Sequence, residues 1–423
     1  MVANQTEEDF SLSRGLVPRY LLGEGIPVSE ISTTDEGLCP VSIACSNGKL
    51  EEIKPLKESP EEISTIVLPR FVETHAHLDK AFTWRKTPNF AGTYEGALKA
   101  NFEEHKYRNK DDLYTRADKA LNLAFKNGYR AIRTHIDSYG IQAEISWEIL
   151  LTLQKEWVDK IQLQLVALVP IEYWTTGEGQ LFAARVSSLG GLLGGVVLPP
   201  FQMEIVRNQL EKLIKLANKL NCGIDLHIDE SQEYPAFGLQ QLVEALDRID
   251  SCVPITCSHS SSMSLLDDED LNKLADRLAF HRVNVIALPL TNSWLLGRRE
   301  NKSPLIRPLA PIIQLQNAGV NVAIGGDNVG DPWYPIGNFD PLALMASSLP
   351  IAQVVPWDNF GLSLFTNAPA KLMQLDWDGK LKKGMRADFI LIEADSWTKA
   401  LSKLPSREVI VAGRKHPKNS YDY

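Results

Sequence analysis

Residues 65–79 read Thr65-Ile66-Val67-Leu68-Pro69-Arg70-Phe71-Val72-Glu73-Thr74-His75-Ala76-His77-Leu78-Asp79. The first nine residues are mostly aliphatic, aromatic or β-branched, which predicts a strand from Ile66 to Glu73. His75 and His77 follow it directly. Side chains two residues apart on extended backbone point to the same side, so both imidazoles can bind one metal ion. The stretch predicts half of a metal site at the end of a strand.

Strand-like and helical segments alternate after this stretch. Two of the longer helical segments are Asp111 to Asn127 and Gln202 to Leu220. The alternation predicts repeated βα units, and eight strands suggest an α/β fold of the (β/α)8 TIM-barrel type. The predicted strands are Ile66 to Glu73, Ala131 to Ile136, Leu163 to Leu168, Gly195 to Leu198, Ile224 to His227, Ile255 to Ser258, Asn284 to Leu288 and Asn321 to Ile324.

The two ends of the chain differ from its centre in their pattern of apolar residues, Gly and Pro. Short apolar runs broken by Gly and Pro occupy about residues 16–64, and a similar sequence pattern occurs after about residue 376. Both read as small β-structure. We expect residues 1–65 and 376–423 to form one small β-sandwich domain, with the barrel at residues 66–375. No long linker separates independent modules.

Bulk composition excludes several classes of protein. The 423 residues are enough for a barrel and a smaller module. The formal charge of −9 and the scattered basic residues argue against a nucleic-acid polymer as partner. Five cysteines without a CxxC pair suit reduced thiols, and no apolar run approaches the roughly 18 residues that would cross a membrane. We expect a soluble cytoplasmic protein.

Metal-binding residue types recur where other predicted strands end. His227 ends the fifth strand, His259 follows the sixth, and Asp327 comes just after the eighth. A barrel gathers these strand ends at one mouth, whatever their separation in sequence. His135 also ends a strand, and its role stays open between structural residue and ligand.

Three imidazoles and one carboxylate suit a single transition ion such as Zn²⁺ or Fe²⁺ with a coordination position left for water. Such an ion lowers the pKa of that water. Hydrolysis at a C–N centre also needs a group that delivers a proton to the departing nitrogen. Glu230, three residues after His227, is the candidate general acid/base, although it could instead be a helix-entry carboxylate. Asp229 is the weaker candidate for this role.

Several motifs together resemble the cytosine deaminase branch of the amidohydrolase superfamily, from about Leu16 to Pro417. They are Phe71-Val72-Glu73-Thr74-His75-Ala76-His77-Leu78-Asp79, Asp225-Leu226-His227-Ile228-Asp229-Glu230, Ser258-His259-Ser260 and Asp327-Asn328-Val329-Gly330-Asp331-Pro332-Trp333-Tyr334-Pro335.

The resemblance assigns a role to each of these site residues. It implies that His75, His77, His227 and Asp327 bind one metal ion. By the same resemblance Glu230 shuttles protons, His259 assists electrostatically, and Asp327 also accepts a proton from the nucleophilic water. The superfamily's bridging lysine is missing from the fourth strand, Gly194-Gly195-Val196-Val197-Leu198-Pro199-Pro200, so a mononuclear site is expected.

Four further residues bear on the substrate. Trp333 can offer an aromatic face to a planar heterocycle, or it can be a structural residue of its turn. Ile171 stands where cytosine deaminases usually carry a Gln that reads the substrate, and its side chain cannot form hydrogen bonds. Asn328 stands where cytosine-specific relatives commonly have Asp. Lys80 resembles the branch that removes alkylamines from triazines, or it pairs with a nearby acid.

The leading hypothesis is a metal-dependent hydrolytic deaminase of a small cyclic amidine or nucleobase, cytosine-like, which releases ammonia. Alkylaminotriazine hydrolysis and cyclic-amide opening are the nearest alternatives. A non-catalytic scaffold and a polynucleotide deaminase are further ones, but all four metal-site residues and Glu230 are present, and the Cys-rich signature of the polynucleotide enzymes is not. Homo-oligomerisation is suggested by the resemblance alone.

Overall fold

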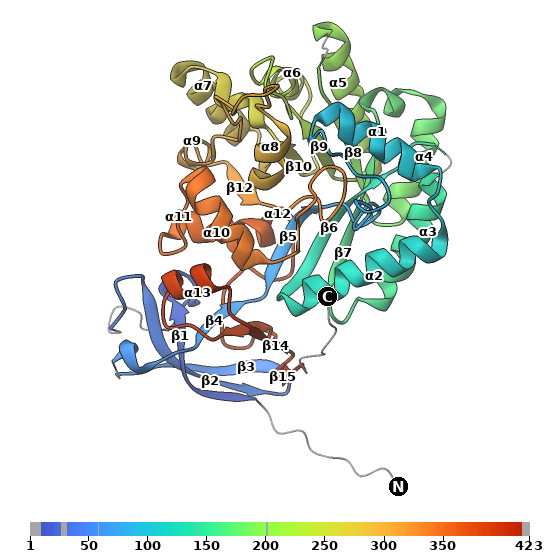
Figure 1. Cartoon of the computed structure of the whole chain (residues 1–423). Helices are drawn as coiled ribbons and strands as arrows, with labels where there is room; N and C mark the ends of the chain where they lie inside the picture. The colour runs from blue at the N-terminus through green and yellow to red at the C-terminus, as the bar shows by residue number, and fades with distance from the viewer. Residues whose placement is uncertain (1–9, 27–31, 58, 141, 200–201, 417–423) are drawn as a thin grey trace.

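The structure is a computed structural model that describes the chain except for residues 1–9, 27–31, 58, 141, 200–201 and 417–423. Eight strands form a parallel sheet in the order β12-β11-β10-β9-β8-β7-β6-β5 (Figure 1). A parallel bridge between Ala76 and Asp327 joins the two edges, so the sheet closes into a barrel. The barrel strands are β5 Phe71–Ala76, β6 Tyr129–Asp137, β7 Gln162–Leu168, β8 Leu192–Val197, β9 Ile224–Ile228, β10 Ile255–His259, β11 Asn284–Ala287 and β12 Asn321–Ile324.

Helices connect these strands and surround the barrel (Figure 1). The sequence encodes them by capping and by amphipathic spacing. In α2, for example, the Asn109 side chain accepts a hydrogen bond from the Asp112 backbone N at 3.0 Å. The helices up to β12 are α1 Tyr94–His105, α2 Lys110–Lys126, α3 Gln142–Glu156, α4 Gly177–Ser188, α5 Met203–Leu220, α6 Phe237–Leu246, α7 Asp268–Phe280, α8 Pro289–Leu295 and α9 Ile312–Asn317. Those after β12 are α10 Pro341–Ala352, α11 Asn359–Ser363, α12 Asn367–Leu372 and α13 Trp397–Lys403.

The terminal segments form a second, mixed sheet in the order β15-β14-β13-β4-β1-β2-β3. Only the β1–β4 pair is parallel among the pairings of the described strands in this sheet. Figure 1 shows this sheet at the lower left, away from α1. Its strands are β1 Ser11–Pro18, β2 Leu38–Ser46, β3 Lys49–Pro55, β4 Ile66–Pro69, β13 Phe389–Ile392, β14 Arg407–Val411 and β15 Arg414–Lys415.

These observations confirm the predicted TIM-type barrel and the joining of the two chain ends in a small β-domain. That domain takes the form of one mixed sheet. The domain limits at about residues 65 and 376 stay predictions, and their outer ends, 1–9 and 417–423, lie outside the described residues.

One predicted strand, Ile66 to Glu73, is wrong as a single element. The structure divides it at Arg70, so that β4 pairs with β13 and β1 in the terminal sheet while β5 pairs with β6 in the barrel. The buried Arg70 side chain donates a hydrogen bond to the Lys160 carbonyl at 2.8 Å and another to the Tyr129 carbonyl. Arg70 therefore anchors the passage between the two sheets.

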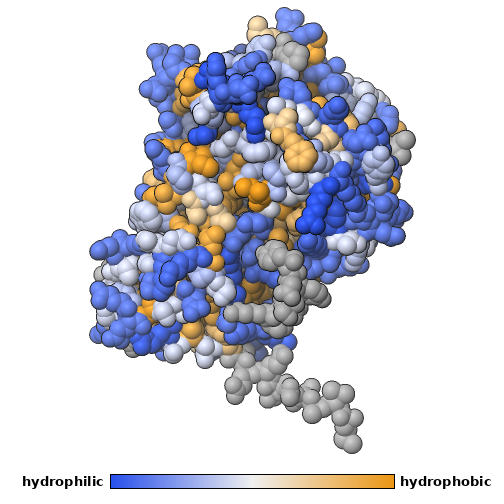
Figure 2. Space-filling view, viewed as in Figure 1, coloured by the Kyte–Doolittle hydropathy of each residue, from blue (hydrophilic) through white to orange (hydrophobic). Residues whose placement is uncertain are grey.

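Hydrophilic and hydrophobic residues are interspersed over the face shown in Figure 2. None of the helices within the described ranges has the length and apolar character needed to cross a membrane.

Candidate active site

Three strand ends bring the four predicted metal ligands together at one mouth of the barrel. His75 lies in β5 with His77 just after it, His227 lies in β9, and Asp327 follows β12. The Asp327 backbone N donates to the His75 carbonyl at 3.0 Å, which fixes the two edges of the closed sheet against each other. All four side chains are at most 7% exposed.

The distances between these side chains fit one shared ion. Asp327 Oδ1 lies 3.5 Å from His75 Nε2 and 3.4 Å from His77 Nε2, and His77 Nε2 lies 3.3 Å from His227 Nε2. Tetrahedral coordination with metal–nitrogen bonds of about 2.0–2.1 Å places neighbouring ligand atoms about 3.3–3.4 Å apart. The observed spacing is that of a coordination shell.

Unpaired polar atoms support the same interpretation. His75 Nε2 and both carboxylate oxygens of Asp327 are buried, and they have no hydrogen-bond partner within the described ranges of the chain. Buried polar atoms rarely stay unpaired, because their desolvation is not compensated. A divalent cation would satisfy them, so the residues present fit a metal ion.

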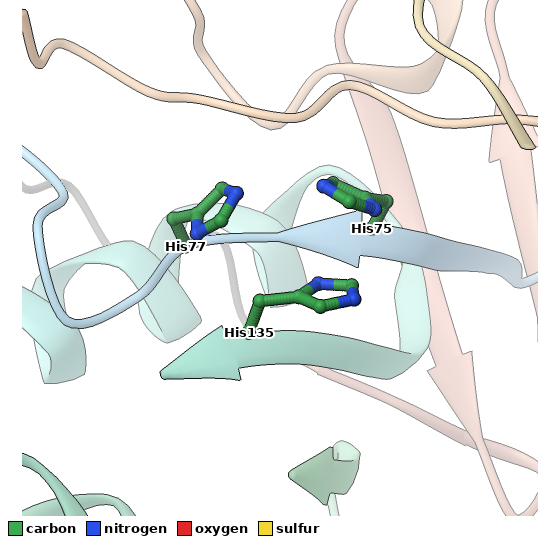
Figure 3. A group of neighbouring side chains, drawn as sticks. All are labelled: His75, His77 and His135. Carbon is green, nitrogen blue, oxygen red and sulfur yellow. The ribbon is translucent and has the colours of Figure 1, made fainter. Parts of the chain in front are cut away.

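Two further histidines border this group. His75, His77 and His135 offer ligand atoms within 4.8 Å of one another, and so do His75, His227 and His259. Figure 3 shows His75 on β5, His77 just past the end of β5 and His135 on the neighbouring strand β6. His135 Nε2 lies 3.3 Å from Asp225 Oδ1. The sequence left His135 open, and its signal was its place at the end of a strand.

A buried hydrogen-bond chain determines how His75 presents its ring. Ser258 Oγ donates to Asp225 Oδ1 at 3.0 Å, and Arg133 Nη1 donates to Asp225 Oδ2 at 2.7 Å. Because the Ser258 proton points to Asp225, Ser258 Oγ accepts from His75 Nδ1 at 2.9 Å. The proton then sits on Nδ1, and His75 Nε2 presents its lone pair to the site.

Burial keeps the imidazoles neutral. It is the largest effect that lowers the pKa of His75, His77 and His227, and neighbouring basic side chains lower it further. Burial also lowers the pKa of His259 to about 3. Neutral imidazole is the form that binds a metal ion.

Glu230 and His259 form a pair beside this group. Glu230 Oε1 lies 3.4 Å from His259 Nδ1, and Asn292 Nδ2 lies 3.1 Å from the same nitrogen. If the Asn292 amide donates to Nδ1, the neutral His259 ring carries its proton on Nε2. Burial, and secondarily the charge of Asp327, raises the pKa of Glu230 well above its usual range.

Asp229 has a structural role. Its two carboxylate oxygens accept from the backbone N of Gly238 and of Leu239, both at 2.8 Å, at the start of α6. Those contacts use the carboxylate for helix capping. The backbone of Asp229 (φ 55°), His259 (φ 69°) and Asp327 (φ 64°) is left-handed, which is uncommon for such residues and clusters at functional sites.

A cavity of about 430 Å³ opens at this mouth. Its polar lining includes His77, His227, Glu230, His259 and Asp327, which places the candidate ligands and the acid/base candidates in one space. The apolar lining includes Leu98, Phe102, Leu168, Val169, Val196 and Leu198.

Three of the four predicted substrate residues line this cavity: Lys80, Asn328 and Trp333. Asn328 Nδ2 donates to Asp331 Oδ2 at 2.9 Å, and Asp331 Oδ1 also accepts from the backbone N of Trp333, so Asp331 shapes the turn. The Trp333 ring packs edge-on against Tyr94, with centroids 5.0 Å apart.

Lys80 and Ile171 differ in what the structure shows for them. Lys80 pairs with acids, which is one of the two roles that the sequence left open for it. Its Nζ lies 2.9 Å from Asp137 Oδ1 and 3.7 Å from Asp79 Oδ1. Ile171 is 4% exposed and lies outside the lining of the cavity, among the described residues. We therefore do not carry Ile171 forward as a substrate contact.

Among the polar or aromatic side chains of the lining that sequence reasoning missed are Tyr94, Asn101, His105 and Asp137. The first three lie on α1. No sequence signal shows that this helix contributes to the mouth, whereas Asp137 could have been noticed as a carboxylate at the end of β6.

Comparison with known proteins agrees with this geometry. The chain belongs to the amidohydrolase family, whose sequence profile matches residues 194–415, and it is a hydrolase that acts on C–N bonds. It is 30% identical over 413 residues to a pterin deaminase from Rhizobium rhizogenes, covering 95% of this chain and 92% of the relative.

Two solved structures share the fold. A 5-methylcytosine deaminase from Klebsiella pneumoniae with bound 5-fluorocytosine superposes with a TM-score of 0.82 at 22% identity and covers 98% of both chains. An N-isopropylammelide isopropylaminohydrolase from Burkholderia multivorans superposes with a TM-score of 0.71 at 22% identity, over 96% of this chain and 98% of the other.

Proposed function

We propose that this protein is a metal-dependent deaminase of a planar heterocycle, in which water replaces an exocyclic amino group on a cyclic amidine carbon. The observation that carries the proposal is the set of unpaired buried atoms of His75 and Asp327 beside a cavity that also contains Glu230 and His259. A binding site that assembles all of these groups is suited to hydrolysis.

The proposed ligands of one divalent ion, Zn²⁺ or Fe²⁺, are His75, His77, His227 and Asp327. When bound, the ion would supply a water of lowered pKa and polarise the reacting centre. Strand β8 carries no lysine for a second ion, which supports a mononuclear site. Ser258 and Asp225 orient His75 for this role.

Glu230 is the proposed proton shuttle. Water adds to the amidine carbon, a proton passes to the exocyclic nitrogen, the C–N bond breaks, and ammonia leaves a ring carbonyl behind. Glu230 is suited to the transfer because it lines the cavity and burial favours its protonated form. His259, with a proton on Nε2, would stabilise negative charge that develops on the attacking oxygen, and Asp327 would accept the first proton.

The proposed substrate is a heterocycle of the pterin type, with cytosine-like single rings as the narrower version. The similarity to a pterin deaminase over nearly the whole chain supports this choice. Trp333 and Tyr94 provide an aromatic wall for a planar ring, while Asn328 and Lys80 provide polar contacts. The cavity volume falls within the usual range of small-molecule sites, about 300–1,000 Å³.

Removal of an alkylamine from a triazine is the second candidate. Lys80 in the cavity favours it, together with the fold shared with the isopropylaminohydrolase. A non-catalytic scaffold would have no need to keep the metal-site residues and Glu230 in one cavity, so we do not propose it. A cytoplasmic location and a homo-oligomer stay predictions of the sequence.

The test is amine release by zinc- or iron-loaded protein from pterin, cytosine and N-isopropylammelide. Glu230→Gln should abolish turnover of whichever substrate reacts, while Glu103→Gln, a change at a partly exposed residue of α1 that does not line the cavity, should not. Turnover that persists in Glu230→Gln would refute the assigned shuttle. Failure of the loaded protein to release amine from all three compounds would count against the proposed reaction.

A further inference from the structure

The cavity has a polar group that metal binding and proton transfer do not use. Hydrogen bonds to a substrate ring cannot come from the Ile171 side chain, which is buried outside the cavity lining as the structure describes it. Ring recognition therefore needs other side chains. The non-aromatic polar residues left in the lining are Lys80, Asn101, His105, Asp137, Ser138 and Asn328.

Three of these, Lys80, Asn101 and His105, converge on the carboxylate of a fourth, Asp137, at the end of β6. Asp137 Oδ1 accepts from Lys80 Nζ at 2.9 Å, and Asp137 Oδ2 accepts from Asn101 Nδ2 at 3.0 Å and lies 3.2 Å from His105 Nε2. Asn101 and His105 are one helical turn apart on α1, so both reach the same carboxylate. The contacts tie α1 to the barrel mouth.

Asn101 keeps one polar atom unused. Its side chain is 5% exposed and lines the cavity, but its Oδ1 has no hydrogen-bond partner in the part of the chain that the structure describes. The amide cannot profit from a flip, because that would place Oδ1 against the Asp137 carboxylate, which only accepts. An acceptor held in this way is available to a donor from another molecule, and such a donor would offset the cost of its burial.

We infer that Asn101 reads the substrate: its Oδ1 accepts a hydrogen bond from a ring N–H or amino group, while Asp137 and His105 hold the amide in that orientation. Asn101 is then a specificity-determining residue, and Asp137 and His105 are positioning residues. The inference rests on the proposed function and deepens it. An acceptor at this place selects heterocycles that carry a hydrogen-bond donor in addition to the amidine group that reacts.

Binding can test this without turnover. Zinc-loaded Glu230→Gln protein is titrated with pterin and with pterins methylated at one nitrogen at a time. We expect one methylation to weaken binding by about tenfold or more, because it removes the donor and leaves Asn101 Oδ1 unpaired. In the Glu230→Gln, Asn101→Leu protein, pterin should bind as weakly as that analogue, and the analogue should lose no further affinity.

Two further variants separate recognition from damage to α1. The Asn101→Ser side chain is too short to reach the same place, so this variant should also lose the discrimination between pterin and the methylated analogue. It replaces Asn101→Leu if that variant does not fold. Lys99→Leu changes an exposed residue of α1 and should leave the discrimination intact.

The outcomes distinguish the inference from the reaction. If Asn101→Leu and Asn101→Ser fold and still discriminate between pterin and every methylated analogue as the parent does, the inference is overturned. Failure of every pterin to bind the parent protein would overturn it as well. If the discrimination behaves as expected but the unmodified enzyme releases no ammonia, the inference stands and the proposed reaction fails.

Discussion

Replacing Ser258 by Ala should weaken metal binding without unfolding the protein. Ser258 Oγ joins His75 Nδ1, 2.9 Å away, to Asp225 Oδ1, 3.0 Å away, and all three side chains are fully buried. The change removes the acceptor that keeps the His75 proton on Nδ1. It frees the ring to adopt the tautomer in which Nε2 carries the proton and cannot bind a metal ion.

The size of the effect follows from these contacts. Loss of a hydrogen-bond partner behind a metal-bound His typically lowers metal affinity about 10- to 100-fold, which is about 1.4–2.7 kcal/mol. Asp225 keeps its bond to Arg133 at 2.7 Å, so its charge stays paired and the fold should survive. We expect zinc affinity in the Ser258→Ala protein to fall within that range.

Competition against a chromogenic zinc chelator at pH 7 measures the effect. Ser348→Ala is the matched control, because Ser348 is equally buried but lies on α10, away from the barrel mouth. Ser258→Thr keeps the hydroxyl and should retain more affinity than Ser258→Ala. A folded Ser258→Ala protein with zinc affinity within about twofold of the unmodified protein would refute the assigned orientation of His75, because the expected loss is at least about tenfold.

Three other changes have definite expected outcomes. Glu230→Gln should lower kcat by about 100-fold or more with zinc content unchanged, measured by ammonia release and metal analysis; a kcat near that of the unmodified enzyme contradicts it. Gly326→Ala should lower the thermal midpoint, since the added Cβ would lie 2.9 Å from Glu73 Oε2, whereas Gly177→Ala adds a Cβ in open space and should not. Zinc at 1,000 times its Kd should stabilise the apoprotein by about 4 kcal/mol, and this gain should shrink sharply in His75→Ala, as followed by denaturant unfolding.

The barrel could be predicted because each of its strands carries a local signal. Short runs such as Ile224 to His227 and Asn321 to Ile324 are mostly apolar, bounded by turn residues and separated by segments with a helical pattern. The split at Arg70 could not be predicted in this way. The sequence from Ile66 to Glu73 is continuous, and the exchange of partner strands depends on β13, more than 300 residues further on.

The candidate metal site could be predicted from residue type and barrel topology together, with the family resemblance assigning the roles. Parallel strands in a barrel end at the same mouth, so His75, His227 and Asp327 must be neighbours once their strands are assigned. His135 obeys the same rule, but residue type does not separate a ligand from a histidine that supports one. Only the distances to His75 and to Asp225 place it at the border of the group.

The residues that we propose for substrate recognition are positioned in a different way. Asn101 and His105 lie on α1, within the long excursion between β5 and β6, and their place depends on how that excursion folds back over the mouth. Strand ends are fixed by the closed sheet, whereas α1 is held at the mouth by side-chain contacts such as those to Asp137. Substitutions on α1 should therefore change which ring is bound while leaving the metal ligands in place. This separation explains why the sequence indicated the reaction more readily than the substrate.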